Sequence, residues 1–345
     1  MTFKSCLLAL LLAAAPALAQ VTTEAPPAIP GAKPVTIEHI KVHSPSIEGN
    51  LEGESADRDV FVALPPGYAS HPDKRYPVVY ALHGFWIGAE QWMKEIHVPQ
   101  TLEGAFAQGA AEMIVVFPDS KTIYDGSFYS SSVTSGDFET FIAHDLISYI
   151  DSHYRTLAAR ESRGLAGHSM GGYGATRIGF KHADVFGALY IMSPCCQSAH
   201  TVDPDDIAAL EAVKVPADLA RLSLKAHSHL AIAAAWSPDP HNPPLYFDLP
   251  VKNGALRPEI LAKWAANAPL DFLDQYVFSL RQYRAIAIDV GDQDMLKTDA
   301  GKLHEALDLY GIANSFEIYP GTHTSHVAYR IQEKAIPFFA KNLRF

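Results

Sequence analysis

Two stretches near the start of the chain alternate between apolar and polar residues with a period of two. They cover residues 35–42 and 58–64, and Pro65-Pro66-Gly67 follows the second. This alternation is typical of antiparallel strands with one buried face. The pattern therefore predicts two edge strands at the beginning of the folded part.

Four later stretches are nearly continuous in apolar residues, as in strands that are buried on both faces of a parallel sheet. They cover residues 78–82, 113–117, 187–192 and 285–290, and a shorter strand pattern covers 316–319. Helical periodicity separates them, over residues 90–108, 138–154, 170–182, 296–310 and 326–342. This alternation of strands and helices predicts an α/β fold with a mostly parallel central sheet flanked by helices.

The alternation is interrupted between Met192 and Ala285. This stretch holds helical patterns and the proline-rich residues 236–244, but no pattern of a buried strand. A long insertion of this kind is more often a functional element than a plain loop. We therefore predict a helical cap, inserted at about residues 197–282 into a single domain that covers residues 20–345.

The first residues have the pattern of a signal peptide. Lys4 precedes an apolar run over residues 7–15, and Ala17-Leu18-Ala19 supplies the small residues that a signal peptidase requires. The run is shorter than the ~20 residues that span a bilayer. We therefore expect residues 1–19 to be removed, and the mature protein to be periplasmic or secreted.

The composition narrows the possible partners. The 345 residues include 27 Lys and Arg against 38 Asp and Glu, which gives a formal net charge of -11. Since no basic run accompanies this charge, the sequence argues against nucleic acid as a partner and against stable membrane insertion. The oligomeric state is left open.

Cysteine and histidine patterns predict neither a disulfide framework nor a metal site. Only three cysteines are present, and the adjacent Cys195 and Cys196 either form a vicinal disulfide or pack as two small residues. The pairs His227-x-His229 and His323-x-x-His326 lack a carboxylate cluster of matching spacing. We expect no metal and no cofactor.

A candidate nucleophile lies in Gly167-His168-Ser169-Met170-Gly171-Gly172, between a short apolar stretch and a helical pattern. A serine on such a tight strand-to-helix turn projects from the sheet, and the glycines avoid collisions with the strand and the helix. The sequence therefore predicts Ser169 as the nucleophile of an acyl-transfer reaction.

A serine nucleophile needs a base, and the base needs an acid that orients it, in the chain order Ser, acid, His. The turn after the strand at 285–290 offers Asp294, with Asp292 as the alternative. The loop after the last strand offers His323, with His326 as the alternative. We expect Asp294 and His323 to complete a catalytic triad.

The oxyanion of an acyl-transfer transition state requires backbone N–H donors. Met170 follows the nucleophile at a helix N-terminus, and the loop after residues 78–82 offers Phe85, with Gly84 as the alternative. Aromatic walls suit apolar or aryl acids. The candidate pocket residues are Trp86, Trp92, Phe128, Tyr129, Trp236 and Tyr246.

These motifs together resemble the esterase D branch of the α/β-hydrolase superfamily, which includes S-formylglutathione hydrolases, feruloyl esterases, enterochelin-esterase-like proteins and mycolyltransferases. The matching motifs are residues 64–68, 76–84, 126–129, 167–175 and 321–323. The resemblance covers about residues 45–195 and 283–345 and implies the same triad of Ser169, Asp294 and His323. The second imidazole, His326, departs from the common pattern.

The expected activity is hydrolysis of a small-molecule carboxylic ester through an acyl-enzyme. Transfer of the acyl group to another acceptor uses the same triad and differs in whether water reaches the acyl-enzyme. Hydrolysis of a thioester of the S-formylglutathione type is a further alternative. A non-catalytic binding protein on this scaffold would lack a member of the triad, and all three residue types are present.

Overall fold

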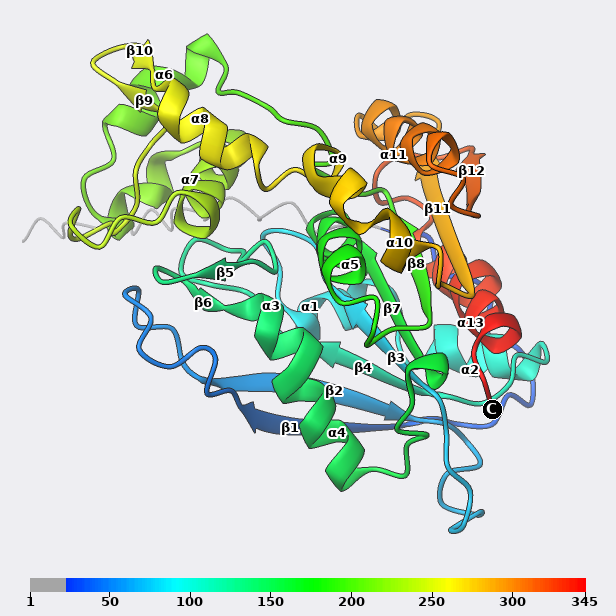
Figure 1. Ribbon diagram of the computed structural model, residues 1–345. Coiled ribbons are helices and arrows are strands. Elements are labelled where there is room, and N and C mark those ends of the chain that lie inside the picture. The colour runs from blue at the N-terminus through cyan, green and yellow to red at the C-terminus, as the bar shows by residue number, and fades with distance from the viewer. Residues whose placement is uncertain (1–22) are drawn as a thin grey trace, which may run out of the picture.

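An eight-stranded sheet forms the centre of the molecule in the computed structural model, which describes residues 23–345 (Figure 1). In spatial order the strands are β1 (Thr36–His43), β2 (Asp57–Leu64), β4 (Ile114–Pro118), β3 (Val78–Leu82), β7 (Arg163–His168), β8 (Ala188–Met192), β11 (Ala285–Gly291) and β12 (Ser315–Tyr319). The six strands from β4 to β12 are parallel, whereas β1 and β2 are antiparallel to their neighbours. The predicted signal peptide, residues 1–19, lies outside the described residues.

The prediction that residues 58–64 form an edge strand was wrong. Only β1 lies at this edge, because β2 pairs with β1 on one side and with β4 on the other. Residues 60–64 are all buried. Their apolar side chains alternate between the two hydrophobic cores, one on each face of the sheet.

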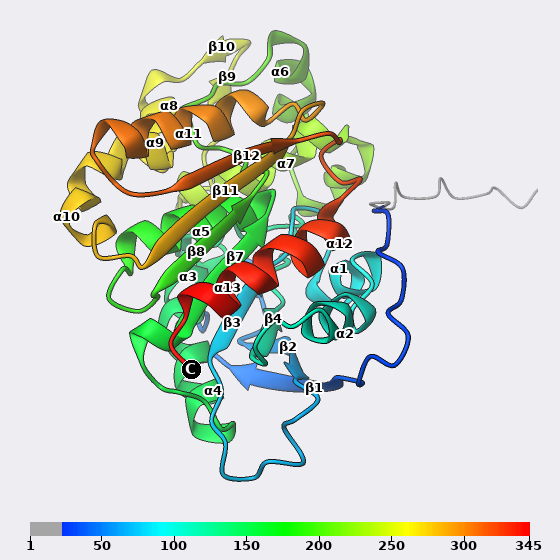
Figure 2. The same cartoon turned by 90° about the vertical axis from the view of Figure 1, so that its right-hand side faces the viewer.

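Helices cover both faces of the sheet, and Figure 2 shows α1, α2, α12 and α13 together on one face. On this face lie α1 (Ala89–Glu95), α2 (Gln100–Ala107), α12 (Val327–Arg330) and α13 (Ile336–Asn342), the last two joined by a π-helical turn (Ile331–Ala335). The other face holds α3 (Phe138–Thr140), a π-helical turn (Phe141–Asp145), α4 (Leu146–His153), α5 (Met170–Lys181) and α11 (Lys297–Leu309). A further 3-10 turn (Arg160–Ser162) precedes β7.

The helix expected over residues 90–108 is divided into α1 and α2. The division falls at residues 96–99, where His97 has a φ of 55° and Pro99 follows Val98. Proline lacks a backbone N–H and disfavours helical geometry in the residue before it, so one continuous helix cannot pass through this point.

The chain between β8 and β11, residues 193–284, is called the β8–β11 segment below. It contains α6 (Pro204–Glu211), a 3-10 helix (Pro216–Arg221), α7 (Leu224–Trp236), β9 (Val251–Lys252), β10 (Ala255–Leu256), α8 (Pro258–Ala265), α9 (Pro269–Phe272), a 3-10 helix (Leu273–Tyr276) and α10 (Val277–Leu280). Figure 1 shows α6, α7 and α8 standing out beyond the small hairpin of β5 (Ser131–Ser132) and β6 (Gly136–Asp137). The helices α9 and α10 lead back along α5 to β11.

Two further observations concern the predictions about the paired cysteines and about membrane insertion. Cys195 and Cys196 are both free thiols. Among residues 23–345, no helix combines the length and hydropathy that a membrane span needs.

Candidate active site

Ser169 occupies a strained turn between β7 and α5. Its φ of 60° and ψ of −116° lie outside the regions that L-residues ordinarily adopt. A Cβ atom on Gly167 would lie 2.0 Å from the Gly171 carbonyl oxygen, and one on Gly171 would lie 2.0 Å from the Leu82 carbonyl oxygen. The backbones of strand and helix therefore pack directly on each other, and the serine side chain is turned out of the sheet.

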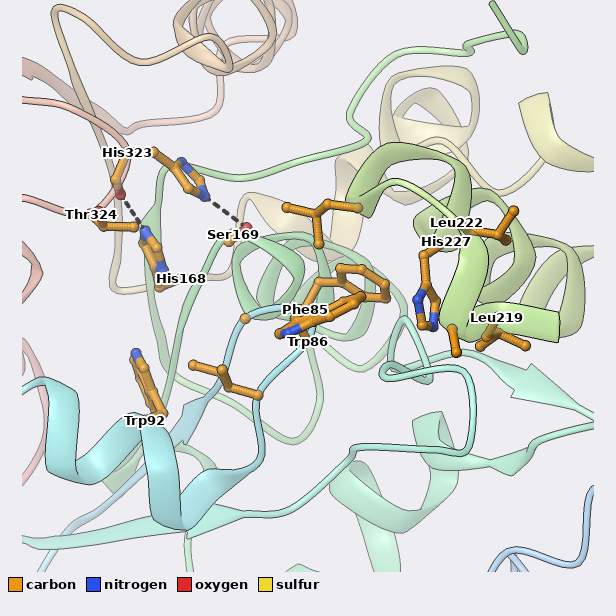
Figure 3. Close-up of a pocket in the computed structure, with 14 residues that line it drawn as sticks. Phe85, Trp86, Trp92, His168, Ser169, Leu219, Leu222, His227, His323 and Thr324 are labelled. Carbon is orange, nitrogen blue, oxygen red and sulfur yellow. Dashed lines mark hydrogen bonds between the residues drawn. The ribbon is translucent and has the colours of Figure 1, made fainter. Parts of the chain in front are cut away.

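The structure brings the side chains of Ser169, His323 and Asp294 into one hydrogen-bonded line. The distance from His323 Nε2 to Ser169 Oγ is 2.9 Å (Figure 3), and the distance from His323 Nδ1 to Asp294 Oδ2 is 2.8 Å. Serine and histidine come from turns at the carboxyl ends of β7 and β12, and the aspartate follows β11. Parallel strands place such turns at one edge of the sheet.

The environment of Asp294 favours its ionised form. Burial by itself raises the pKa of this carboxyl group, but hydrogen bonds from His323 and from the Leu296 N–H, the latter at 2.9 Å, outweigh it and lower the pKa below its usual value. An ionised Asp294 accepts the hydrogen bond of His323 Nδ1–H. This tautomer leaves Nε2 free to accept a proton from Ser169.

The two alternative residues have other partners. Asp292 Oδ1 accepts a hydrogen bond from the Gly321 N–H at 2.9 Å, so this carboxylate ties the turn after β11 to the loop after β12. His326 Nδ1 lies 2.8 Å from Ser325 Oγ. Neither side chain has a hydrogen bond to Ser169 within the described part of the chain.

Sequence reasoning missed His168, which precedes the predicted nucleophile Ser169. Its Nε2 lies 2.8 Å from the carbonyl oxygen of His323, and the two rings are 4.7 Å apart (Figure 3). Burial, reinforced by the neighbouring His323, lowers the pKa of His168 to about 3. The ring is therefore neutral and donates Nε2–H to the loop that carries His323; in the motif Gly-x-Ser-x-Gly this position has no fixed residue type.

Buried side chains fix the loop that contains Phe85, one of the two expected oxyanion donors. His83 Nδ1 is 2.8 Å from the Gly84 carbonyl oxygen, while His83 Nε2 accepts a hydrogen bond from the Ser120 N–H at 2.9 Å. Trp86 N–H donates to the Asp125 carbonyl oxygen at 3.0 Å. Hydrogen bonds within the protein thus hold this loop conformation.

The N–H groups of Phe85 and Met170 donate to no acceptor within residues 23–345. Met170 is the first residue of α5, where the helix dipole favours negative charge. The alternative donor, Gly84, lies beside Ser169, since a Cβ atom there would come within 3.4 Å of Ser169 Cβ.

A cavity of about 800 Å³ opens beside Ser169 (Figure 3). Trp86 and Trp92 line it, as the sequence predicts, together with Phe85 and Ile87. The β8–β11 segment contributes the facing wall, which consists of Leu219, Ala220, Leu222, Leu224 and His227. The lining is mainly apolar, with His168, Ser169, His323 and Thr324 at one end.

Phe128 and Tyr129, which the sequence placed in the pocket, do not line this cavity. Phe128 is buried behind Phe85, with 6.0 Å between ring centroids. Tyr129 is fully buried and donates its hydroxyl to the His83 carbonyl oxygen at 2.9 Å. A buried phenol needs a hydrogen-bond partner, and here that need places the ring beneath the Phe85 loop.

Trp236 and Tyr246 were also expected in the pocket, and this was wrong. Trp236 is buried, donates its indole N–H to Ser130 Oγ at 3.0 Å and packs on Tyr173 at 5.3 Å. The Tyr246 carbonyl oxygen accepts a hydrogen bond from the Thr134 hydroxyl. These residues attach the β8–β11 segment to the sheet domain.

Sequence reasoning missed the cavity wall of the β8–β11 segment, although the spacing of its leucines gives a weak indication of it. Leu219 and Leu222 are three residues apart after Pro216, which is the spacing of one turn of 3-10 helix. His227 Nε2 lies 3.1 Å from Asp125 Oδ2, and its ring is 4.7 Å from Trp86.

Within residues 23–345, no three or more His, Cys, Asp or Glu side chains gather in a group that could hold a metal ion.

The chain is similar to proteins of a known family. The family model Esterase, described as "Putative esterase", matches residues 54–333. The chain belongs to this esterase family. This membership confirms the resemblance found in the sequence motifs.

Two curated relatives of the esterase family match parts of the chain. A protein named endo-1,4-beta-xylanase/feruloyl esterase from Xylanibacter ruminicola is 26% identical over 182 residues, which are 52% of this chain and 24% of that protein. A protein named as an esterase from Mycobacterium tuberculosis is 32% identical over 127 residues, which are 36% of this chain and 26% of that protein. The matched part thus spans about a quarter of the length of these relatives.

Solved structures show that the esterase-family chain has the α/β-hydrolase fold. A ferulic acid esterase superposes with a TM-score of 0.65 and 23% identity, covering 90% of this chain and 99% of that one. An S-formylglutathione hydrolase from Agrobacterium tumefaciens superposes with a TM-score of 0.58 and 16% identity, covering 90% of this chain and 96% of that one. The predicted fold class is therefore confirmed.

Proposed function

We propose that the protein is a serine carboxylic-ester hydrolase that acts through an acyl-enzyme. The observation that carries this proposal is the line from Ser169 through His323 to Asp294, with distances of 2.9 and 2.8 Å, at the end of a mainly apolar cavity. Membership of the esterase family supports it.

In the first half-reaction Ser169 Oγ attacks the ester carbonyl carbon while His323 Nε2 accepts the hydroxyl proton. Asp294 stabilises the imidazolium that forms. The N–H groups of Phe85 and Met170 donate to the oxyanion. The carbon–oxygen bond to the alcohol then breaks, His323 returns the proton to the leaving alcohol, and the acyl group remains on Ser169.

In the second half-reaction water replaces the alcohol. His323 removes a proton from the water, the resulting hydroxide attacks the acyl carbon, and the bond to Ser169 Oγ breaks as this oxygen regains a proton. The products are a carboxylic acid and the free enzyme. No step requires a cofactor.

The cavity favours a bulky apolar or aryl substrate group. Its volume of about 800 Å³ and its wall of indole, phenyl and leucine side chains suit an aromatic ring or an alkyl chain. Relatives named as feruloyl or ferulic acid esterases point in the same direction. The formyl group of S-formylglutathione is far smaller than this cavity, and glutathione is charged where the lining is apolar, so we favour esters over that thioester.

We also propose that the enzyme is exported, because residues 1–19 have the pattern of a cleavable signal peptide. N-terminal sequencing of the protein recovered from outside the cytoplasm should find Gln20 as its first residue. Met1 on that material would contradict export by cleavage at this site.

A panel of substrates tests the activity. Purified protein should hydrolyse p-nitrophenyl butyrate and methyl ferulate faster than S-formylglutathione, and Ser169→Ala should hydrolyse none of them above background. Faster transfer of the acyl group to an added alcohol than to water would favour the acyltransferase alternative. Turnover that persists in Ser169→Ala would contradict the proposed nucleophile.

A further inference from the structure

The described chain begins beside the loop that carries His323. The Glu24 N–H donates to the Ser325 carbonyl oxygen at 2.8 Å, and the Thr23 hydroxyl donates to the same oxygen at 3.3 Å. Figure 2 shows this start of the coloured chain near the N-terminal end of α12. Ser325 is two residues after His323, so the contact lies on the same loop as the proposed base.

Thr23 also caps α12. The N-terminal N–H groups of a helix lack partners within the helix, and a side chain at the N-cap position usually accepts one of them. His326 occupies that position and makes no such hydrogen bond. The Ala328 N–H donates instead to Thr23 Oγ1 at 3.2 Å, across 305 positions of sequence.

The Thr23 and Glu24 contacts add to the other support of the His323 loop. On the side of β12, Asp292 holds the Gly321 N–H, and His168 lies 2.8 Å from the His323 carbonyl oxygen. Beyond His323, Val327 and Ala328 are buried in the core, whereas Ser325 is held by hydrogen bonds from Thr23 and Glu24. Thr23 also accepts a hydrogen bond from the Ala328 N–H. His326 Nε2 also lies 3.7 Å from Glu24 Oε2.

The likeness to esterases does not account for this arrangement, because the family match starts at residue 54. We propose that Thr23 and Glu24, together called the N-terminal clasp, position His323 for proton transfer from Ser169. Thr23 is a positioning residue and does not touch the reacting atoms. The inference rests on the proposed function, in which His323 is the base.

Substitution of Thr23 tests the clasp in the full chain. Thr23→Val keeps the shape of the side chain and removes both of its hydrogen bonds, so we expect kcat for p-nitrophenyl butyrate to fall by about three- to ten-fold. KM should change by less than about two-fold, since the cavity is untouched. Thr23→Ser retains the hydroxyl and should stay within about two-fold of wild type.

Thr36→Val is the matched control. Thr36 is exposed at the start of β1, at the opposite edge of the sheet from β12. The same loss of a hydroxyl group there should leave kcat unchanged. Hydrogen exchange at the Ala328 amide should accelerate in Thr23→Val and stay as in wild type in Thr36→Val.

A double-mutant cycle separates positioning from general loss of structure. If Thr23 acts through His323, Thr23→Val should cause no further loss of the residual rate in His323→Ala. An unchanged kcat in Thr23→Val, or an equal loss in the His323→Ala background, would overturn the clasp while wild-type ester turnover still supported the proposed function. Absence of ester turnover in wild type would overturn the proposed function first, and the positioning role with it.

Discussion

The two sides of the cavity are held in different ways. At the edge of the sheet, backbone contacts at Gly167 and Gly171 and hydrogen bonds to Asp294 fix the reacting groups. The facing wall, at residues 219–227, reaches the cavity mainly through apolar side chains, and Leu224 is 59% exposed. Backbone geometry tolerates little change, whereas apolar contacts accept other side chains of similar volume. Under the proposed function, this contrast predicts that the sheet edge carries out the chemistry and that the facing wall selects the substrate.

The largest expected effect is on the sheet side. Ser169→Ala should lower kcat for every ester by about 10⁴-fold or more, because the remaining rate rests on the oxyanion donors and on binding alone. A fluorophosphonate should label wild type and leave the variant unlabelled, with an unchanged circular dichroism spectrum. Labelling of the variant would place the nucleophile elsewhere.

A pair of neighbouring carboxylates sharpens the comparison within the sheet side. Asp294→Asn should lower kcat by about 10³- to 10⁴-fold, since an amide no longer fixes the required tautomer of His323. Asp292→Asn keeps an oxygen that can accept the Gly321 N–H, so its kcat should fall by less than about ten-fold. Steady-state kinetics on one substrate distinguish the two, and equal losses would mean that the acid has been misassigned.

On the other side, Leu222→Ala should change selectivity more than activity. Part of the wall is lost, so the ratio of kcat/KM between methyl ferulate and p-nitrophenyl acetate should shift by about ten-fold while acetate turnover stays within a few-fold. Leu307→Ala is the matched control, because this buried leucine of α11 lies outside the β8–β11 segment and does not line the cavity. It should lower the free energy of unfolding by about 3–5 kcal/mol with an unchanged ratio, and a changed ratio would contradict the division of roles.

The smallest expected effect is on stability and concerns the carboxyl group of Glu52, which lies near the contact between Tyr124 and the β8–β11 segment. Both Glu52 oxygens are buried without a hydrogen-bond partner among residues 23–345, and burial, reinforced by Glu54, raises the pKa of Glu52 to about 9. Tyr124, whose pKa is raised by burial and by Glu52, packs on Phe247 of the segment at 5.3 Å. Asp294, in contrast, is buried with its hydrogen bonds made.

As the pH rises above the value of 4.5 for an unperturbed glutamate, the unfolded chain loses the Glu52 proton while the folded chain keeps it up to about pH 9. Wild type should therefore lose stability across this range relative to Glu52→Gln. Urea denaturation near pH 8 should find the variant more stable by about 1–3 kcal/mol, with the difference vanishing near pH 4.5. The exposed Glu48→Gln should differ from wild type by less than about 0.5 kcal/mol; a constant difference at all pH values would contradict the assignment.

The same contrast explains what the sequence could predict. The turn at Ser169 requires glycines, and the strand order fixes the chain order Ser, acid, His. Both the glycines and this order can therefore be recognised in the sequence. The strands β3, β4, β8 and β11 were predictable from their apolar runs, whereas β2 was taken for an edge strand. In these cases a residue type follows from local backbone geometry.

The cavity wall could not be predicted in this way. Leu219 and Leu222 resemble any core leucines, and their place depends on how the 3-10 helix and the residue after it come to line the same cavity as Trp86. Trp236 has the residue type of a pocket wall, but its N–H found a partner at Ser130, and this long-range contact cannot be read from the sequence. His168 was missed because its partner, the His323 carbonyl oxygen, is 155 positions away.

The wall side chains Leu219, Ala220, Leu222 and Leu224 lie within six consecutive residues. A single synthetic cassette spanning residues 219–224 would therefore diversify most of this wall in one cloning step, without altering any codon of the sheet edge. Such a library varies the residues expected to select the substrate and leaves the proposed catalytic residues unchanged. Nearly every member should therefore still react with a fluorophosphonate. The protein is in this respect a convenient starting point for directed evolution of ester selectivity.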